Sequence, residues 1–353
     1  MVESTARSRR PWLFVPFAAV VLIAIVWSGF WYVAASRADA VITAWLAEEA
    51  KHGRIHRCGS RTSGGYPFRI EVRCIDPTVE LVNAQPPRLL RGKEVVGVAQ
   101  VYDPDLIIAE ITGPLAIAEA REPAGQVAVW RADWRLAQAS LRGIAGTPER
   151  LSVVLDGARL ERAEGTSAET WAAANRLALH VRRNPVSSAD KPVVDVAAQV
   201  AGVTVPAAPV LAGRPLDAEV TALVSGLADW RPKPVPARLR EWQVAGGRVK
   251  VIRLRLQQGD AVAIAVGDIG LSAAGRPDGA FNVTMTGFDQ LVQQLVGSSQ
   301  QGGGLQIGVM AGLAFLGRPA EIDGRRAVSV ALRFNDGAVF LGPIPLGRME
   351  PLY

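Results

Sequence analysis

The longest apolar run of the chain lies near its start. Residues Trp12–Ala35 are 24 consecutive positions without a formal charge. As a helix rising about 1.5 Å per residue, they extend roughly 36 Å, more than the roughly 30 Å hydrocarbon core of a bilayer. Interfacial aromatics are expected at the ends of such a segment, and here they are Trp12 at one end and Trp27, Trp31 and Tyr32 at the other. We therefore predict a transmembrane segment over residues 12–35.

The residues beside this segment predict its orientation. Arg7, Arg9 and Arg10 precede it, so the positive-inside rule places residues 1–11 in the cytoplasm and the bulk of the chain outside it. Ala38-Asp39-Ala40 has the small-x-small form of a signal-peptidase site, so cleavage after Ala40 is the alternative. The apolar part of a signal peptide usually has about 7–15 residues. The longer run here favours an uncleaved, single-pass anchor.

Helical periodicity continues beyond the anchor. The apolar positions at i, i+3, i+4 spacing are Ala38, Val41, Ile42, Trp45 and Leu46. We predict a juxtamembrane helix over residues 36–52, ending at about Lys51 before Gly53. Its apolar stripe can pack on the bilayer surface or on the domain that follows, and docking on the domain is favoured.

After residue 53 the pattern changes to short alternating or apolar runs separated by turn residues, which is typical of strands. Runs repeat about every 10–20 residues, a spacing that favours antiparallel meanders over βαβ units. The predicted strands are Thr78–Val82, Val95–Val101, Leu106–Ile111, Val127–Leu136, Leu151–Leu155, Leu177–Arg182 and Val193–Val200. Leu216–Leu227 has mixed character and is interpreted as a strand or a short helix.

The Pro-rich stretch Arg231–Pro236 predicts a connection between two β-rich subdomains, residues 53–230 and 237–353. In the second, the pattern predicts helices at Arg238–Val244, Phe288–Val296 and Ile307–Leu316, and strands at 248–254, Ala261–Ala273, Ala280–Thr286, Ala327–Phe334 and Ala338–Leu341. Asn335-Asp336-Gly337 is a hairpin signal. The predicted fold is α+β and mostly β: a transmembrane helix, then an extended, curved antiparallel sheet with a few covering helices.

The chain contains two cysteines, Cys58 and Cys74. A compartment outside the cytoplasm is oxidising, so a disulfide between them is favoured. Closing a loop of about 15 residues contributes roughly 3 kcal/mol in the chain-entropy model. A zinc site built from His52, His56 and the two thiols is the alternative. It is disfavoured because Gly53 interrupts the helix that would place both imidazoles on one face.

Composition narrows the choice of partners. A chain with 49% hydrophobic and 20% charged residues is not of the disordered class. A net charge of +6 permits a polyanionic partner, but nucleic acid is disfavoured outside the cytoplasm and with few interleaved aromatics. Basic residues recur at period 2 in Arg131/Arg135, Arg248/Lys250 and Arg253/Arg255. They indicate an anionic headgroup contact or, as the favoured interpretation, the solvated face of a sheet.

Motifs of enzymatic chemistry are missing from the sequence. Ser272 lies between Gly270 and Gly275 and misses the G-x-S-x-G nucleophile pattern by one residue. Neither G-x-x-x-x-G-K-[ST] nor H-E-x-x-H occurs. We therefore predict a protein that is not an enzyme, without catalytic residues, cofactor or metal.

Several segments resemble one family. Gly65-Tyr66-Pro67-Phe68-Arg69-Ile70, the following Cys74, Gly275-Arg276-Pro277-Asp278-Gly279 and the closing segment from Asp336 to Gly347 look like the family called domain of unknown function 2125. That family is bacterial, is found mainly in alphaproteobacteria, begins with a signal anchor and has no established activity. The strand–turn–strand style is also similar to AsmA-like envelope proteins, which are linked to outer-membrane and lipid homeostasis.

Together these features predict a membrane-anchored periplasmic protein that binds lipid or another envelope component in maintenance of the cell envelope. The inner-membrane bilayer is the first expected partner. A structural or assembly factor acting through protein contacts is the alternative, and a hydrolase with a dispersed site is the least favoured function.

Overall fold

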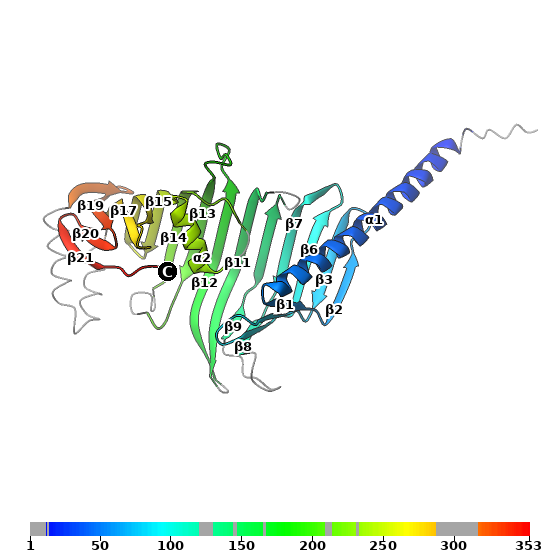
Figure 1. Cartoon of the computed structure of the whole chain (residues 1–353), viewed down its shortest axis with the longest axis horizontal. Helices are drawn as coiled ribbons and strands as arrows, with labels where there is room; N and C mark the ends of the chain where they lie inside the picture. Colours follow the sequence, from blue (N-terminus) through cyan, green and yellow to red (C-terminus); the bar gives the residue numbers. More distant parts are fainter. Residues whose placement is uncertain are drawn as a thin grey trace, which may run out of the picture.

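The computed structural model describes residues 12, 14–119, 130–143, 147–164, 167–208, 214–230, 233–286 and 317–353. This part of the chain contains a long apolar helix, a short helix and one large antiparallel sheet (Figure 1). The predicted fold class is therefore confirmed. The predicted helices Phe288–Val296 and Ile307–Leu316 lie outside the described residues.

Helix α1 (Val15–Lys51) is 37 residues long and runs unbroken through both the predicted anchor and the predicted juxtamembrane helix. Its first half extends beyond the sheet, and its second half lies across the end of the sheet (Figure 1). The helix ends where predicted because Gly53 has a φ of +77°, a conformation that glycine adopts without steric cost. By length and composition α1 can cross a membrane.

The strands of the first half of the chain are β1 (Arg54–Arg57), β2 (Ser60–Gly64), β3 (Arg69–Ile75), β4 (Thr78–Leu81), β5 (Arg88–Arg91), β6 (Glu94–Gln100), β7 (Asp103–Thr112), β8 (Leu115–Glu119), β9 (Trp130–Asp133), β10 (Leu136–Arg142) and β11 (Arg150–Glu164). The sheet divides at β11, whose first half pairs with β10 and whose second half pairs with β9. One arm then runs β10-β7-β6-β3-β2, and the other runs β9-β8-β5-β4-β1.

The sheet continues from the other edge of β11. The remaining elements are β12 (Ser167–Arg183), β13 (Val193–Val203), β14 (Leu216–Ser225), α2 (Val235–Val244), β15 (Arg248–Gln258), β16 (Ala261–Leu271), β17 (Pro277–Met285), β18 (Arg318–Ile322), β19 (Arg325–Asn335), β20 (Ala338–Leu341) and β21 (Ile344–Arg348). Strands β11 to β17 pair in chain order, and β19 follows β17. The far edge of β19 is shared by β18 and β20, and β21 pairs with β20.

Several boundaries differ from the sequence prediction. The predicted strand Val127–Leu136 is wrong as one element, because Trp130–Asp133 is β9 and Leu136 begins β10, which pair with different neighbours. The ambiguous segment after Leu216 is strand β14. β14 pairs directly with β15 across the Pro-rich stretch, so the sheet is continuous there. The division into two subdomains stays a prediction.

The hairpin predicted at Asn335-Asp336-Gly337 joins β19 to β20. Asp336 and Gly337 have φ values of 45° and 82°, the two positive φ angles that a tight turn matching the twist of the strands requires. The disulfide is also formed: Cys58 and Cys74 have their sulfurs 2.00 Å apart. It connects the segment between β1 and β2 to β3.

Replacing both Cys58 and Cys74 by Ser should lower the free energy of unfolding by roughly 3 kcal/mol, the loop-closure contribution of a disulfide of this span. Denaturant titration of the anchored protein in detergent measures the change. A reducing agent should lower the stability of the wild type by the same amount and leave the double variant unchanged. Equal stability of oxidised wild type and double variant would contradict the prediction.

Candidate functional site

One face of the sheet is apolar over nearly its whole length. Residues paired directly across antiparallel strands share a face, so the register of the strand pairs identifies rows that cross the sheet. One such row takes one residue from each strand it crosses. It consists of Ile70, Ala99, Ile107, Leu141, Leu151, Val181, Val196, Ala222, Val251, Gly267, Phe281, Leu332 and Leu341. No member of this row carries a polar side chain.

The row beside it on the same face has the same character. It consists of Val72, Gly97, Ala109, Ala139, Val153, Leu179, Ala198, Val220, Leu254, Ala265, Val283 and Val330. We call the surface formed by these two rows the apolar face. At about 4.8 Å between neighbouring strands, a row from β3 to β20 extends on the order of 55 Å.

The opposite face is mixed: it carries polar and charged side chains over much of its length, and a buried apolar cluster of Val262, Ile322 and Ala327 lies on it at β16, β18 and β19. Its corresponding row begins Glu71, Val98, Ile108, Ser140 and Ser152, and continues with His180, Ala197, Thr221 and Arg253. Ion pairs join neighbouring strands there, with Arg176 to Asp156 at 2.9 Å and Arg182 to Asp195 at 2.7 Å. Asparagine and arginine hydrogen bonds lower the pKa of Asp195.

Four residues of the predicted basic pairs lie on this face by register: Arg248, Lys250, Arg253 and Arg255. Arg248 contacts Asp268, and Arg255 lies 2.8 Å from Asp323. Arg253 belongs to the polar row itself.

The apolar face is covered in its middle and open on both sides. Its deepest positions lie on β13–β15, where Val194, Ala222 and Val251 are buried and where Figure 1 shows α2 over the strands. Between β7 and β12, Ile107 and Leu179 each expose 38% of their surface. Between β15 and β19 there is an open hollow of about 240 Å³. Its lining is Leu254, Leu256, Ala263, Ala265, Phe281, Val283, Leu332 and Phe334.

The far end of the apolar face is closed by the last strands. Val330 and Leu341 are buried there, and Leu346 of β21 packs against them. Hydrophobic side chains therefore form a small core at this end. The hollow beside it leaves its apolar lining accessible to solvent.

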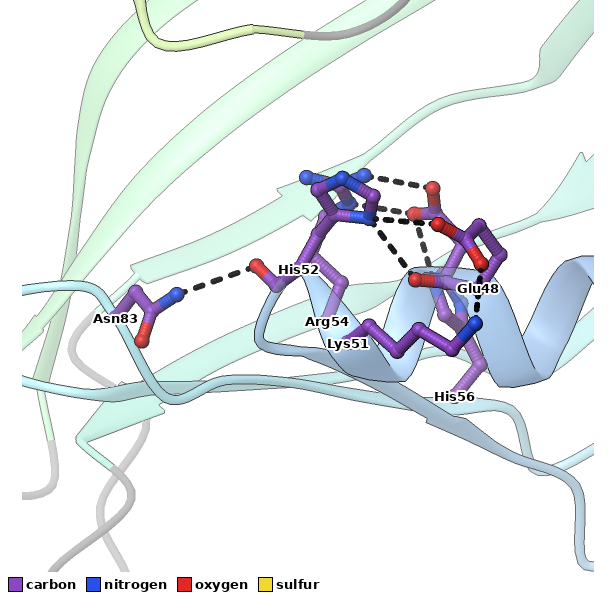
Figure 2. A network of polar contacts seen from close by, with 7 residues as sticks. Glu48, Lys51, His52, Arg54, His56 and Asn83 are labelled. Atoms are coloured by element: carbon purple, nitrogen blue, oxygen red, sulfur yellow. Dashed lines mark hydrogen bonds and ion pairs between the residues drawn. The ribbon is translucent and has the colours of Figure 1, made fainter.

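The near end of the sheet is held by α1. Trp45 contacts the ring of His56 on β1 with 5.0 Å between centroids. Glu49 accepts hydrogen bonds from Arg54 at 2.5 and 2.6 Å (Figure 2). The Glu49 side chain is only 13% exposed, and the Arg54 hydrogen bond lowers the pKa of its carboxyl group. The structure therefore contains the predicted docking of this helix on the domain.

A second, exposed network surrounds this contact. Lys51 lies 2.8 Å from Glu48, and the hydrogen bond between them lowers the pKa of Glu48. His52 Nδ1 lies 2.9 Å from the Glu48 carbonyl oxygen, and Asn83 donates to the His52 carbonyl oxygen (Figure 2). The alternative zinc site is not formed, because the disulfide consumes both thiolates.

The predicted anchor aromatics have different surroundings. Trp12 and Tyr32 are exposed, whereas Trp27 and Trp31 contact the turn between β2 and β3. Trp27 Nε1 donates to the Pro67 carbonyl oxygen and Trp31 Nε1 to that of Arg69, each at 2.9 Å. Arg7, Arg9 and Arg10 lie outside the described residues.

Sequence reasoning missed two features of this site. The sequence shows the alternation of apolar and polar residues within single strands. It does not show which strands pair, so it does not reveal the continuous apolar rows. The contact of Tyr66 and Phe68 with α1 was also missed. The only local signal was the presence of two aromatics in a turn.

Replacing Glu49 by Gln should weaken the contact between α1 and β1, because hydrogen bonds to a charged group contribute roughly 1.5–3 kcal/mol each. Amide hydrogen exchange of residues 46–57 in the full chain should accelerate. Glu48→Gln is the matched control, because its exposed pair with Lys51 contributes little. Equal exchange in both variants would contradict the role assigned to Glu49.

The same contact should depend on pH. The folded-state pKa of Glu49 lies below its ordinary value of 4.5, so the ionised carboxylate stabilises the folded state above that value. The stabilisation is lost as the pH falls through the lowered pKa. Exchange of residues 46–57 should accelerate over that acidic range in the wild type and change less in Glu49→Gln.

Comparison with known proteins gives a family and nothing more specific. No curated protein and no solved structure matches the chain. Residues 31–350 match the family described as "Uncharacterized protein conserved in bacteria (DUF2125)". Since the match begins within α1 and extends to the last residues after β21, it includes the whole sheet, and the chain belongs to the DUF2125 family.

Proposed function

We propose that this protein is held in the bacterial inner membrane by the first half of α1 and binds acyl chains of lipid on the apolar face of its periplasmic sheet. The observation that carries the proposal is the apolar face itself, with rows that cross the sheet without a polar side chain. Contiguous apolar surface on a soluble domain marks a binding or membrane-contact site.

The chemistry of the apolar face favours hydrocarbon over a polar ligand. The hollow between β15 and β19 is lined only by Leu, Ala, Val and Phe side chains. Such a surface binds a ligand by van der Waals contact and by excluding water from apolar groups. Its side chains provide no hydrogen-bond partner for a polar group. The ligand that such a surface binds best is a long apolar chain. The polar headgroup of a lipid would remain at the edge of the sheet. We accordingly propose a non-enzymatic role in the cell envelope.

A second candidate function is assembly through protein contacts. An open apolar face also fits a partner protein that lays an apolar surface on it. The two functions differ in what touches Ile107 and Leu179: hydrocarbon in the first case, and a polypeptide in the second.

A photo-crosslinking residue at position 107 or 179 should capture lipid from cells. Positions 108 and 180 are the matched controls, because they are the next residues on the same strands and are also exposed but belong to the polar row. Mass spectrometry of the purified adducts identifies the captured molecule. Lipid at 107 and 179 only is expected. Protein adducts at those positions would favour the assembly factor, and equal lipid capture on both faces would contradict the proposal.

The proposed orientation has its own test. Val186, in the loop after β12, is 83% exposed. Val186→Cys should react with a membrane-impermeant maleimide in cells with a permeabilised outer membrane, whereas Ser4→Cys should react only after the inner membrane is lysed. The reverse pattern would overturn the orientation. An intact mass that lacks residues 1–40 would show cleavage and contradict the anchor.

A further inference from the structure

The turn between β2 and β3 lies against the part of α1 that the anchor proposal assigns to the membrane. Tyr66 packs edge-on against Trp31, with 5.5 Å between ring centroids, and Phe68 lies 6.3 Å from Trp27. Even so, Tyr66 and Phe68 remain 55% and 64% exposed. Two large side chains are therefore fixed in place beside the helix while most of their apolar surface has no contact within the described residues.

The length of the apolar helix sets the depth of this turn. About 20 helical residues cross a hydrocarbon core of about 30 Å. If Trp12 marks the cytoplasmic boundary, the opposite boundary falls near Tyr32. Trp27 then lies five residues deeper, or about 7 Å along the axis. Because the Trp27 indole donates to the Pro67 carbonyl oxygen, the turn reaches the same depth.

The composition of the turn fits that depth. Residues 62–68 are Thr-Ser-Gly-Gly-Tyr-Pro-Phe, without a charge, and they are bracketed by Arg61 and Arg69. We call residues 62–68 the hairpin tip. Uncharged residues with aromatics between flanking arginines form the pattern of a segment at a membrane interface. Arg61 is paired with Asp39 of α1 at 2.8 Å, seven residues beyond Tyr32 and outside the apolar span.

Three backbone carbonyls and one hydroxyl of the tip have hydrogen-bond partners within the protein. The carbonyl oxygen of Gly65 accepts from the Arg69 amide, and that of Phe68 accepts from the Val101 amide. The carbonyl of Pro67 accepts from Trp27. The hydroxyls of Tyr66 and Ser28 lie 2.8 Å apart and share a hydrogen bond. Polar groups that enter a bilayer need such partners, since each unsatisfied group costs several kcal/mol there.

We propose that the hairpin tip is a second membrane-contact element, inserted into the periplasmic leaflet beside α1 with Tyr66 and Phe68 against lipid. This inference rests on the proposed anchor. It places the β3 end of the apolar face at the membrane surface, because Ile70 and Val72 follow the tip directly on that face. Lipid leaving the leaflet at the tip would meet the apolar rows without crossing water.

The test places an environment-sensitive fluorophore on single added cysteines of the full chain in nanodiscs that contain nitroxide-labelled lipid. The variant Phe68→Cys reports on the tip, Ile23→Cys on the middle of the anchor, and Val186→Cys on an exposed apolar position in the loop between β12 and β13. Unchanged hydrogen exchange of β2 and β3 in Phe68→Cys confirms that the hairpin keeps its structure.

Insertion predicts blue-shifted emission and nitroxide quenching at positions 68 and 23, and neither at position 186. Quenching at 23 without quenching at 68 would overturn the insertion of the tip and leave the anchor in place. Absence of quenching at 23 would instead overturn the anchor. If Phe68→Cys disturbs the hairpin, the fluorophore is moved to Tyr66→Cys, for which the same outcomes are decisive.

Discussion

The alternation of apolar and polar residues, kept in register from β3 to β20, is the constraint on which the rest of this structure depends. Side chains of a strand alternate between two faces, so a slip of one residue between any two strands would move apolar side chains onto the polar face. Bulges occur, for example between Val251 and Leu254 of β15, yet the rows resume on the same face after it. The sheet therefore has one continuous apolar face that requires a cover, and an opposite face with ion pairs over much of its length and a small buried apolar cluster of Val262, Ile322 and Ala327.

That requirement explains where the helices lie. α2 lies over the most deeply buried part of the apolar face, and the end of α1 joins the two arms of the sheet by contacting β1 on one and β2 and β3 on the other. Because α1 is a single helix, the sheet is attached to the apolar first half of α1 without an intervening loop. The orientation of the sheet relative to α1 is fixed by the contacts of Trp27, Trp31, Asp39 and Glu49.

The sequence predicted most elements whose signal is local. The long apolar helix, its end before Gly53, the disulfide and the hairpin at Asp336-Gly337 all follow from residues near one another in the chain. Six strands, β1, β2, β5, β8, β18 and β21, were missed because each has only four or five residues, too few for alternation to stand out. β11 and β12 were predicted too short because charged residues such as Arg159 and Glu161 occupy their far halves.

The sequence by itself determined a β-rich chain with one N-terminal helix long and apolar enough to cross a membrane, since hydrophobic run length and period-2 alternation depend on neighbouring residues only. It did not determine that Ile107 and Phe281 lie in one row, that β11 divides the sheet into two arms, or that Tyr66 and Phe68 meet Trp27 and Trp31. Those relations join residues distant in the chain, and they depend on which strands pair. Only the tertiary structure decides that pairing. Many alternating strands have faces that could pair equally well, and the assembly of the whole sheet selects one set of neighbours.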